Sequence, residues 1–264
     1  MFGSITISAA AGTARGNSKI GNSSPNSRSG THLPDLQRLR DTLVEQGFPV
    51  EIVDLSEGEG VAHVLVARGV FKGHAAEQEL MGLQFPTTKA GRRAGEVVNC
   101  VGSTHAMVCG YRQEDDPTRA LQRVWHWEDV PHLASIRERL VALLGRELYF
   151  DLIAYPDVTG GIGFHGDRER QLLAGVRFGP RTAEFLLRFR WYKHWRSVGA
   201  EMQIQLEEGD LYVPCEKATG WDAGRRSVLT LRHAAGADTA TCLINAAKLR
   251  EKRAKGIVKK PRGK

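Results

Sequence analysis

One short segment carries two residues that could bind a metal ion together. His165 and Asp167 lie on either side of Gly166 in the sequence GIGFHGDRER. On a β strand, residues i and i+2 point to the same face, so an imidazole and a carboxylate at this spacing converge. These groups are two of the three protein ligands in a two-histidine, one-carboxylate iron centre. The same spacing also fits a polar strand end capped by an aspartate, so other residues must decide.

Two arginines further along the chain could hold an anion beside such a metal. Arg226 and Arg232 are six positions apart, an even number, so on a strand they would face the same side. If that side faces the interior, the buried guanidinium groups need an anionic partner. A dicarboxylate such as 2-oxoglutarate is a suitable one, because guanidinium binds carboxylate through two parallel hydrogen bonds.

The order of these motifs resembles the AlkB-like family of iron(II)/2-oxoglutarate-dependent dioxygenases. The chain has His-x-Asp, then GDLYV at 209–213, then two arginines separated by five residues in a segment that ends TLRH. The resemblance covers residues 147–236, which it implies to be the catalytic jelly roll. The combination of GFHGDRER, CEKATGWD and TLRHAAG is similar to a subgroup of algal, protist and large-DNA-virus proteins.

The resemblance assigns roles to particular residues. It implies that His165 and Asp167 bind Fe(II) and that 2-oxoglutarate chelates the iron and meets Arg226. Arg232 would support the cosubstrate and the reaction from nearby, and Tyr155 resembles the tyrosine that contacts the cosubstrate. Dioxygen is the second cosubstrate, and the implied reaction oxidises a C–H bond.

The third metal ligand is not evident from the sequence. The family places a second histidine between the Gly-Asp strand and Arg226, but residues 211–225 contain no histidine. Asp222 falls near the expected position, and a carboxylate is an acceptable iron ligand. His233 is the alternative, although it would point outward if Arg232 points inward, unless a bulge intervenes. A site without a third ligand is also consistent with the sequence.

Nucleic acid is the expected partner. Residues 248–264 carry nine Lys or Arg and one Glu, and such a tail can neutralise phosphates, although it also fits a solvated tail or a localisation signal. Arg168, Glu169 and Arg170 would lie at the pocket mouth. Aromatic residues near the site could stack on a flipped base or could be ordinary strand packing: Trp191, Tyr192, Trp195 and Trp221.

The implied activity is therefore oxidative demethylation of an alkylated nucleic-acid base. Two alternatives stay open. The first is a catalytically inactive jelly roll that binds nucleic acid, which a missing second histidine would favour. The second is a 2-oxoglutarate-dependent protein hydroxylase, which a polar pocket mouth without stacking residues would favour.

The chain around these residues is predicted to be an α+β protein with a jelly-roll (double-stranded β-helix) core. Residues 1–31 are rich in Ser, Gly and Asn, which predicts a disordered segment. Residues 32–146 predict a supporting α+β region with helices at 34–46 and 131–144, and His105 there reads as structural. Residues 147–240 carry short strands separated by turns, which is typical of a jelly roll. Residues 241–264 predict a helix and the basic tail.

The composition also bears on the compartment. The four cysteines show no Cys-x-x-Cys spacing, which favours free thiols in a reducing environment. The chain has no apolar run long enough to span a membrane and no signal-peptide pattern at its start. The sequence therefore predicts an intracellular protein, cytoplasmic or nuclear, with no membrane partner.

Overall fold

The strands of the protein lie mostly in two sheets. The computed structural model describes residues 2–11, 30–90, 97–100, 102–110, 123–156, 160–168 and 170–236. Its larger sheet has eight strands in the order β2-β3-β13-β10-β1-β8-β6-β7, the smaller has four in the order β12-β11-β14-β9, and β4 pairs with β5. The prediction of a mixed chain built mostly from strands is confirmed at this level.

The elements have the following bounds. The strands are β1 (Ser4–Ala11), β2 (Val50–Asp54), β3 (His63–Ala67), β4 (Thr88–Ala90), β5 (Val97–Asn99), β6 (Thr104–Cys109), β7 (Arg123–His126), β8 (Leu148–Tyr155), β9 (Gly161–His165), β10 (Leu173–Phe178), β11 (Leu187–Lys193), β12 (Arg196–Ile204), β13 (Leu211–Pro214) and β14 (Thr230–Gly236). The α-helices are α1 (Leu33–Glu45), α2 (Ala76–Gly82), α3 (Pro131–Leu144) and the short α4 (Glu216–Thr219).

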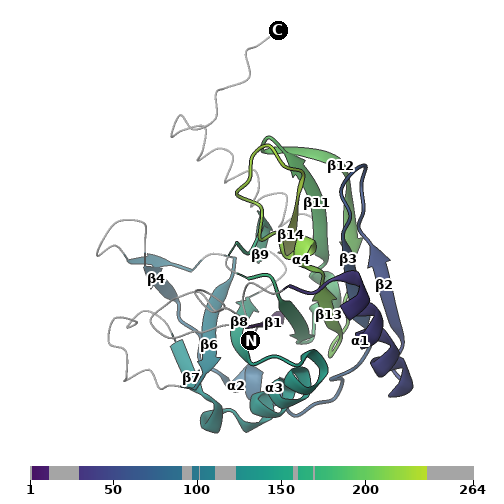
Figure 1. Ribbon diagram of the computed structural model, residues 1–264. Coiled ribbons are helices and arrows are strands. Elements are labelled where there is room, and N and C mark those ends of the chain that lie inside the picture. The colour runs from purple at the N-terminus through teal and green to yellow at the C-terminus, as the bar shows by residue number, and fades with distance from the viewer. Residues whose placement is uncertain are drawn as a thin grey trace.

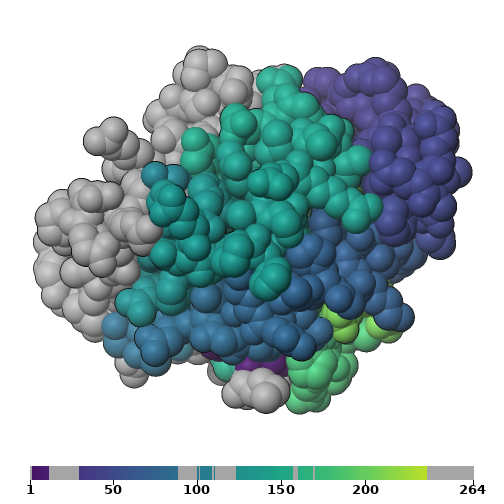
Figure 2. All heavy atoms as spheres, turned by 90° about the horizontal axis from the view of Figure 1, so that it is seen from below, coloured from purple at the N-terminus to yellow at the C-terminus, as the bar shows by residue number. Residues whose placement is uncertain are grey.

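Helices cover one face of the larger sheet. Helix α1 packs on β2 and β3, and α3 packs on α2 and β8, so that their apolar stripes join one core with the sheet. Figure 1 shows the β9, β11, β12 and β14 strands at the top of the view and α2 and α3 at the bottom, and Figure 2 shows the surface on the helical side. Helix α3 has the predicted bounds and ends at Gly145, whose left-handed φ of 64° suits glycine. None of the described helices is long and apolar enough to cross a membrane.

The prediction of disorder over residues 1–31 is wrong for its first part. Strand β1 lies between β8 and β10 and pairs with both, with Ile7 opposite Leu152 on one side and opposite Val176 on the other. The alternation of SITISAAA puts Ile5 and Ile7 into the apolar core, where both are fully buried. The serines and alanines of the strand conceal the pattern. Residues 12–29 and 237–264, including the basic tail and the predicted C-terminal helix, lie outside the described residues.

The other face of the larger sheet is polar and is covered by the smaller sheet. Strand alternation places Ser8 of β1, Asp151 of β8 and Arg177 of β10 on this face, away from the helices. Tyr155 of β8 packs there with Phe185, together with Ala235 of β14 and Ile162 of β9. The larger sheet takes strands from both sides of residue 146, so the predicted boundary between regions falls inside one sheet.

Candidate metal centre

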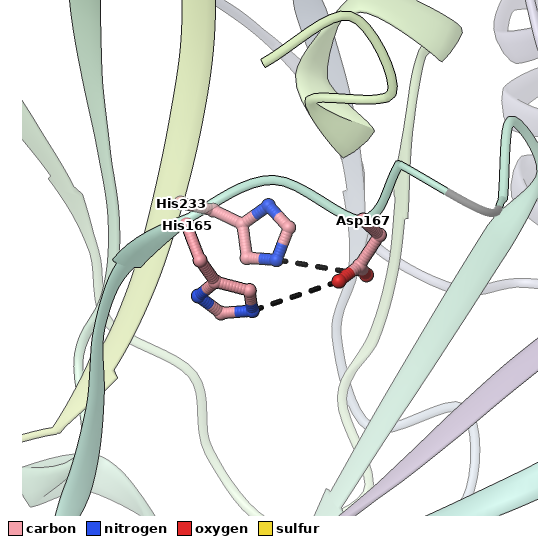
Figure 3. Close-up of side chains that lie close together, drawn as sticks. All are labelled: His165, Asp167 and His233. Carbon is pink, nitrogen blue, oxygen red and sulfur yellow. Dashed lines mark ion pairs between the residues drawn. The ribbon is translucent and has the colours of Figure 1, made fainter. Parts of the chain in front are cut away.

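Two histidines and one aspartate meet between the two sheets. His165 Nε2 lies 3.6 Å from Asp167 Oδ1, and His233 Nε2 lies 3.7 Å from Asp167 Oδ2. One potential ligand atom from each residue lies within 4.8 Å of the other two (Figure 3). Two ligands about 2.1 Å from one ion are roughly 3.0–3.4 Å apart, so these spacings need only a small contraction to hold a transition metal. The chemistry of the three donors fits Fe(II) or Zn(II).

Strand pairing brings the two histidines together. His165 ends β9 and is the register partner of His233 on the antiparallel strand β14, with an irregularity in pairing between His233 and Ala235. Arg232, the neighbour of His233, points to the opposite face, where it lies over the rings of Tyr192 and Trp195. The sequence argument against His233 assumed that Arg232 points inward. Because it points outward, His233 points inward by simple alternation.

The glycine between His165 and Asp167 allows a close backbone approach. A Cβ added to Gly166 would lie 2.2 Å from the carbonyl oxygen of Gly220 and 2.5 Å from the Cβ of Ala223. The Asp167 N–H donates to the carbonyl of Thr219 at 2.9 Å. The turn after α4 therefore holds the His-Gly-Asp segment and fixes the direction of Asp167.

Hydrogen bonds orient both imidazoles. His165 Nδ1 lies 2.9 Å from the carbonyl oxygen of Gly163, which assigns its proton to Nδ1 and leaves the Nε2 lone pair facing Asp167. The backbone of Ala218 hydrogen-bonds to His233. Burial, with the nearby His165, lowers the pKa of His233 to about 4, so its ring is neutral at neutral pH and can act as a ligand.

Arg170 holds the aspartate of the cluster. Burial opposes ionisation of Asp167, but the guanidinium of Arg170 and the two imidazoles outweigh it and keep the pKa of Asp167 below its ordinary value. Arg170 Nε lies 3.9 Å from Asp167 Oδ2, and Nη2 lies 3.6 Å from Asp151 Oδ2. Arg170 Nη1 also donates to Ser8 Oγ at 2.9 Å. Arg170 thus lies inside the site. The sequence analysis had instead placed it at an exposed pocket mouth.

The polar network continues to His105. Asp151 Oδ1 lies 3.2 Å from His105 Nδ1, and the His105 side chain is 44% exposed. The sequence interpretation treated His105 as structural and did not single out Asp151. The signal for Asp151 was the one charged residue in the apolar strand LYFDLIAY.

Asp222, the other candidate for the third ligand, lies elsewhere. Its carboxylate is buried and pairs with Lys217 Nζ at 2.5 Å. The described residues that could jointly hold a metal include His165, Asp167 and His233, and Asp222 is not in that group.

The two arginines predicted to bind 2-oxoglutarate do not share a strand. Strand β14 begins at Thr230, and Arg226 lies in an exposed bend before it. Arg232 is half-buried on the outer face of the smaller sheet, where it donates to the carbonyl of Ala223. The prediction that both face the interior from one strand is therefore wrong. Tyr155 does lie between the sheets, fully buried, and this burial raises its pKa.

A different arginine occupies the interior. Arg177 is 0% exposed and donates to the carbonyl oxygen of Phe185, while its Nε has no hydrogen-bond partner. Among the described residues, no carboxylate lies within ion-pair distance of it. The ring of Tyr212 lies against Gly175, and its hydroxyl interacts electrostatically with both Arg177 and Asp167. A buried guanidinium without a counter-ion is unfavourable, so this position suits an anionic ligand.

The predicted aromatic residues divide between core and surface. Trp191 is fully buried and donates from its indole to the Leu55 carbonyl at 2.7 Å, so it belongs to the core. Tyr192 and Trp221 are partly exposed, and Trp195 is exposed. Arg168 is exposed directly after Asp167, and Glu169 lies outside the described residues.

A two-histidine, one-carboxylate cluster between two sheets defines the class of site, and comparison with known proteins identifies a relative. No family model matches the chain. The chain is 31% identical over 225 residues to the uncharacterized protein R156 of Acanthamoeba polyphaga mimivirus, and the match spans 80% of this chain and 87% of the viral protein. The chain therefore belongs to the same family as that viral protein.

Proposed function

We propose that the protein is an iron(II)/2-oxoglutarate-dependent dioxygenase of the AlkB-like type. The observation that carries the proposal is the meeting of His165, Asp167 and His233 between two sheets. Two imidazoles and one carboxylate on one side of an ion leave its other positions free for ligands. The sequence left the third ligand open between Asp222, His233 and none, and the position of His233 beside Asp167 favours an enzyme over the inactive binding module.

The arrangement of strands supports a jelly-roll core for this enzyme. The smaller sheet contains β12, β11, β14 and β9, and the facing part of the larger sheet contains β13, β10, β1 and β8. Two facing groups of four strands are what a jelly roll of eight strands requires. In this proposal β1 completes the second group from the beginning of the described chain.

The buried Arg177 is the proposed partner of the 2-oxoglutarate carboxylate, in place of Arg226. It lies on the inner face of β10, and the buried hydroxyl-bearing rings of Tyr155 and Tyr212 are beside it. A guanidinium and two phenols can donate hydrogen bonds to one carboxylate. A dicarboxylate bound there neutralises the buried charge.

Each residue of the proposed metal centre has its own role. His165 and His233 would bind the metal through Nε2, Asp167 would add a negative charge, and Arg170 would keep that carboxylate ionised and oriented. Iron with 2-oxoglutarate and dioxygen supplies the oxidising power for C–H hydroxylation. Phe185 and Phe189, both buried between the sheets, would shield the metal centre from water.

The proposed substrate is an alkylated base in nucleic acid. The support is the excess of positive charge, a formal net charge of +7 with nine basic residues in 248–264, together with exposed arginines close to the site. A protein substrate is the alternative, because a hydroxylase would use the same metal and cosubstrate.

Metal binding and succinate formation test the proposal. Metal-free protein is titrated with Fe(II) without oxygen, and succinate is then measured with 2-oxoglutarate, ascorbate and air, with and without methylated single-stranded DNA or RNA. We expect one tightly bound iron and substrate-stimulated succinate. His233→Ala should weaken iron binding by about 10–100-fold or more, as for loss of a metal-site group.

Asp222→Asn is the matched control, because Asp222 was the other sequence candidate and pairs with Lys217 instead. It should bind iron as the unmodified protein does. Loss of iron in Asp222→Asn but not in His233→Ala would contradict the ligand assignment. Absence of both iron binding and succinate in the unmodified protein would refute the enzyme itself.

A further inference from the structure

Five arginines next to the proposed centre have no acidic partner. Among the described residues, no carboxylate lies within ion-pair distance of any member of this set, which we term the arginine surface: Arg168, Arg196, Arg225, Arg226 and Arg232. By contrast, the exposed Arg38, Arg40 and Arg181 each pair with an aspartate or glutamate. Unpaired positive charge gathered on one part of a protein attracts a polyanion.

Contacts tie the arginine surface to the turn between β11 and β12. The His194 N–H donates to the carbonyl of Arg226 at 2.9 Å, and Arg232 donates to the carbonyl of Ala223 at 3.3 Å. The guanidinium of Arg168 lies 2.9 Å from where a Cβ of Gly224 would be. Since Arg168 directly follows Asp167, this surface reaches from the turn to the edge of the metal centre.

Trp195 presents an exposed aromatic ring beside Arg232 of this surface. The residue is 54% exposed, and the Arg232 guanidinium lies 4.8 Å from its ring and 4.5 Å from that of Tyr192. Arg232 therefore braces the indole from one side and leaves much of it open to solvent. An open indole between guanidinium groups suits base stacking with phosphates on either side.

The backbone of this turn is strained in order to hold that ring. Lys193 pairs with Arg196, so His194 and Trp195 form a two-residue hairpin loop, with φ of 50° and 65°. Among the described residues, these two are the non-glycine residues with positive φ. Such loops favour Asn-Gly or Gly-Gly, and bulky residues there are unfavourable. Strain of this kind persists where a function needs the side chain.

We propose that the arginine surface and Trp195 bind single-stranded nucleic acid, with a base on the Trp195 ring and phosphates at Arg225, Arg226 and Arg196. This deepens the proposed function, on whose substrate class it rests, by placing the strand along the path from the hairpin turn to Arg168. Open guanidinium groups alone would also fit an acidic protein segment. The exposed indole among them favours an unpaired base.

Fluorescence anisotropy with the full chain tests the surface. The probe is labelled single-stranded oligothymidylate, with the matching duplex and polyglutamate as competitors, and no iron or 2-oxoglutarate is needed. Trp195→Gly should weaken single-strand binding by about 5- to 100-fold, the effect of losing one stacked base. Arg225→Gln with Arg226→Gln should weaken it and lower the salt slope by about 1.4, since each single-strand phosphate contributes about 0.7.

Matched variants separate the surface from general charge. Arg38→Gln with Arg40→Gln removes the same charge from α1 and should change binding less than twofold. Trp195→Gly should leave the midpoint of thermal unfolding unchanged or higher, because glycine relieves the positive φ. A lower midpoint without loss of binding would show a purely structural role for Trp195.

Three other results would overturn the proposal. The first is a loss of single-strand binding in the α1 variant as large as in the Arg225/Arg226 variant. The others are polyglutamate competing as strongly as unlabelled oligothymidylate, and the duplex binding as tightly as the single strand. If binding behaves as expected but no succinate forms, the surface stands and the proposed oxygenase fails.

Discussion

His165 and His233 are register partners on antiparallel strands, with imidazole centroids 4.4 Å apart and rings inclined at 65°. Their separation is therefore set by the pairing of β9 with β14. A slip of one residue in this pairing would turn one ring to the outer face of the sheet. The third group, Asp167, follows β9 directly and is held by the turn after α4. Two strands and one turn thus build the centre.

Replacement of Arg177 should separate cosubstrate binding from metal binding. Arg177→Gln removes the buried guanidinium, and we expect 2-oxoglutarate to bind at least about 30-fold more weakly, the lower range for loss of a buried charged partner. Fe(II) affinity should change less than about threefold. Isothermal titration without oxygen measures Fe(II) binding to the metal-free protein and 2-oxoglutarate binding to the metal-loaded protein. Arg226→Gln is the control and should bind 2-oxoglutarate normally; the opposite pattern would restore the role that the sequence gave to Arg226.

Gly166 should tolerate no side chain. Gly166→Ala places a Cβ against the backbone of Gly220, and we expect about 1–3 kcal/mol of destabilisation by urea unfolding, with weaker metal binding as Asp167 moves. Gly82→Ala is the matched control, because nothing lies within 4 Å of its added Cβ. That variant should be neutral or slightly stabilised. Equal effects at the two glycines would show that close packing at Gly166 is unimportant.

His74 should make the stability of the helical layer depend on pH. Burial, helped by the nearby positive charges of His132 and Arg139, lowers the pKa of His74 below its ordinary 6.5. Its neutral ring accepts from the Ala76 N–H at 3.1 Å and contacts Ser135 Oγ at 3.2 Å. A histidine whose pKa is lowered in the folded state contributes its full share to the free energy of unfolding above pH 6.5. This contribution is lost as the pH falls below that value.

The comparison of His74→Asn with the unmodified protein measures this contribution. Unfolding by urea is followed from about pH 7.5 to about pH 5, the range in which a histidine titrates. We expect the variant to lose less stability on acidification, because asparagine keeps an acceptor for the Ala76 N–H but does not titrate. Identical pH profiles would exclude a role for His74.

Residue Ile7 tests whether the first strand is part of the core. Ile7 is fully buried, and Ile7→Ala should lower the free energy of unfolding by about 2–5 kcal/mol. Val44→Ala on α1, where the side chain is 52% exposed, should change it by less than about 0.5 kcal/mol. If the segment were disordered, as the sequence suggested, Ile7→Ala would leave the free energy of unfolding unchanged.

The sequence predicted the regular parts of the fold and half of the candidate site. Helix α3 carries clear apolar periodicity and was predicted with its observed bounds. His165 and Asp167 were found because the His-x-Asp spacing suggested convergence on one face, although β9 ends at His165 and the turn after α4 holds Asp167. His233 was ranked below Asp222 because the inward face of β14 was inferred from Arg232.

The missed residues share a physical reason. Arg177 and Asp151 are single charges inside apolar strands, and such charges become informative only when the sheet that faces them is known. Trp195 was named from the sequence as a possible stacking residue, but the positive φ at His194 and Trp195 was not foreseen, because propensity disfavours that conformation for bulky residues. In each case tertiary structure overrides the local pattern.

The position of β1 has a consequence for the timing of folding. Ile7 pairs with Leu152 and Val176, so its partners are translated about 145 and 169 residues later. At 5–20 residues per second, roughly ten to thirty seconds pass on the ribosome before β10 exists. During that time an apolar strand has both edges unpaired and is exposed to aggregation. The protein should therefore fold after translation of its last sheet strands, and a chaperone that shields the nascent β1 should raise its yield.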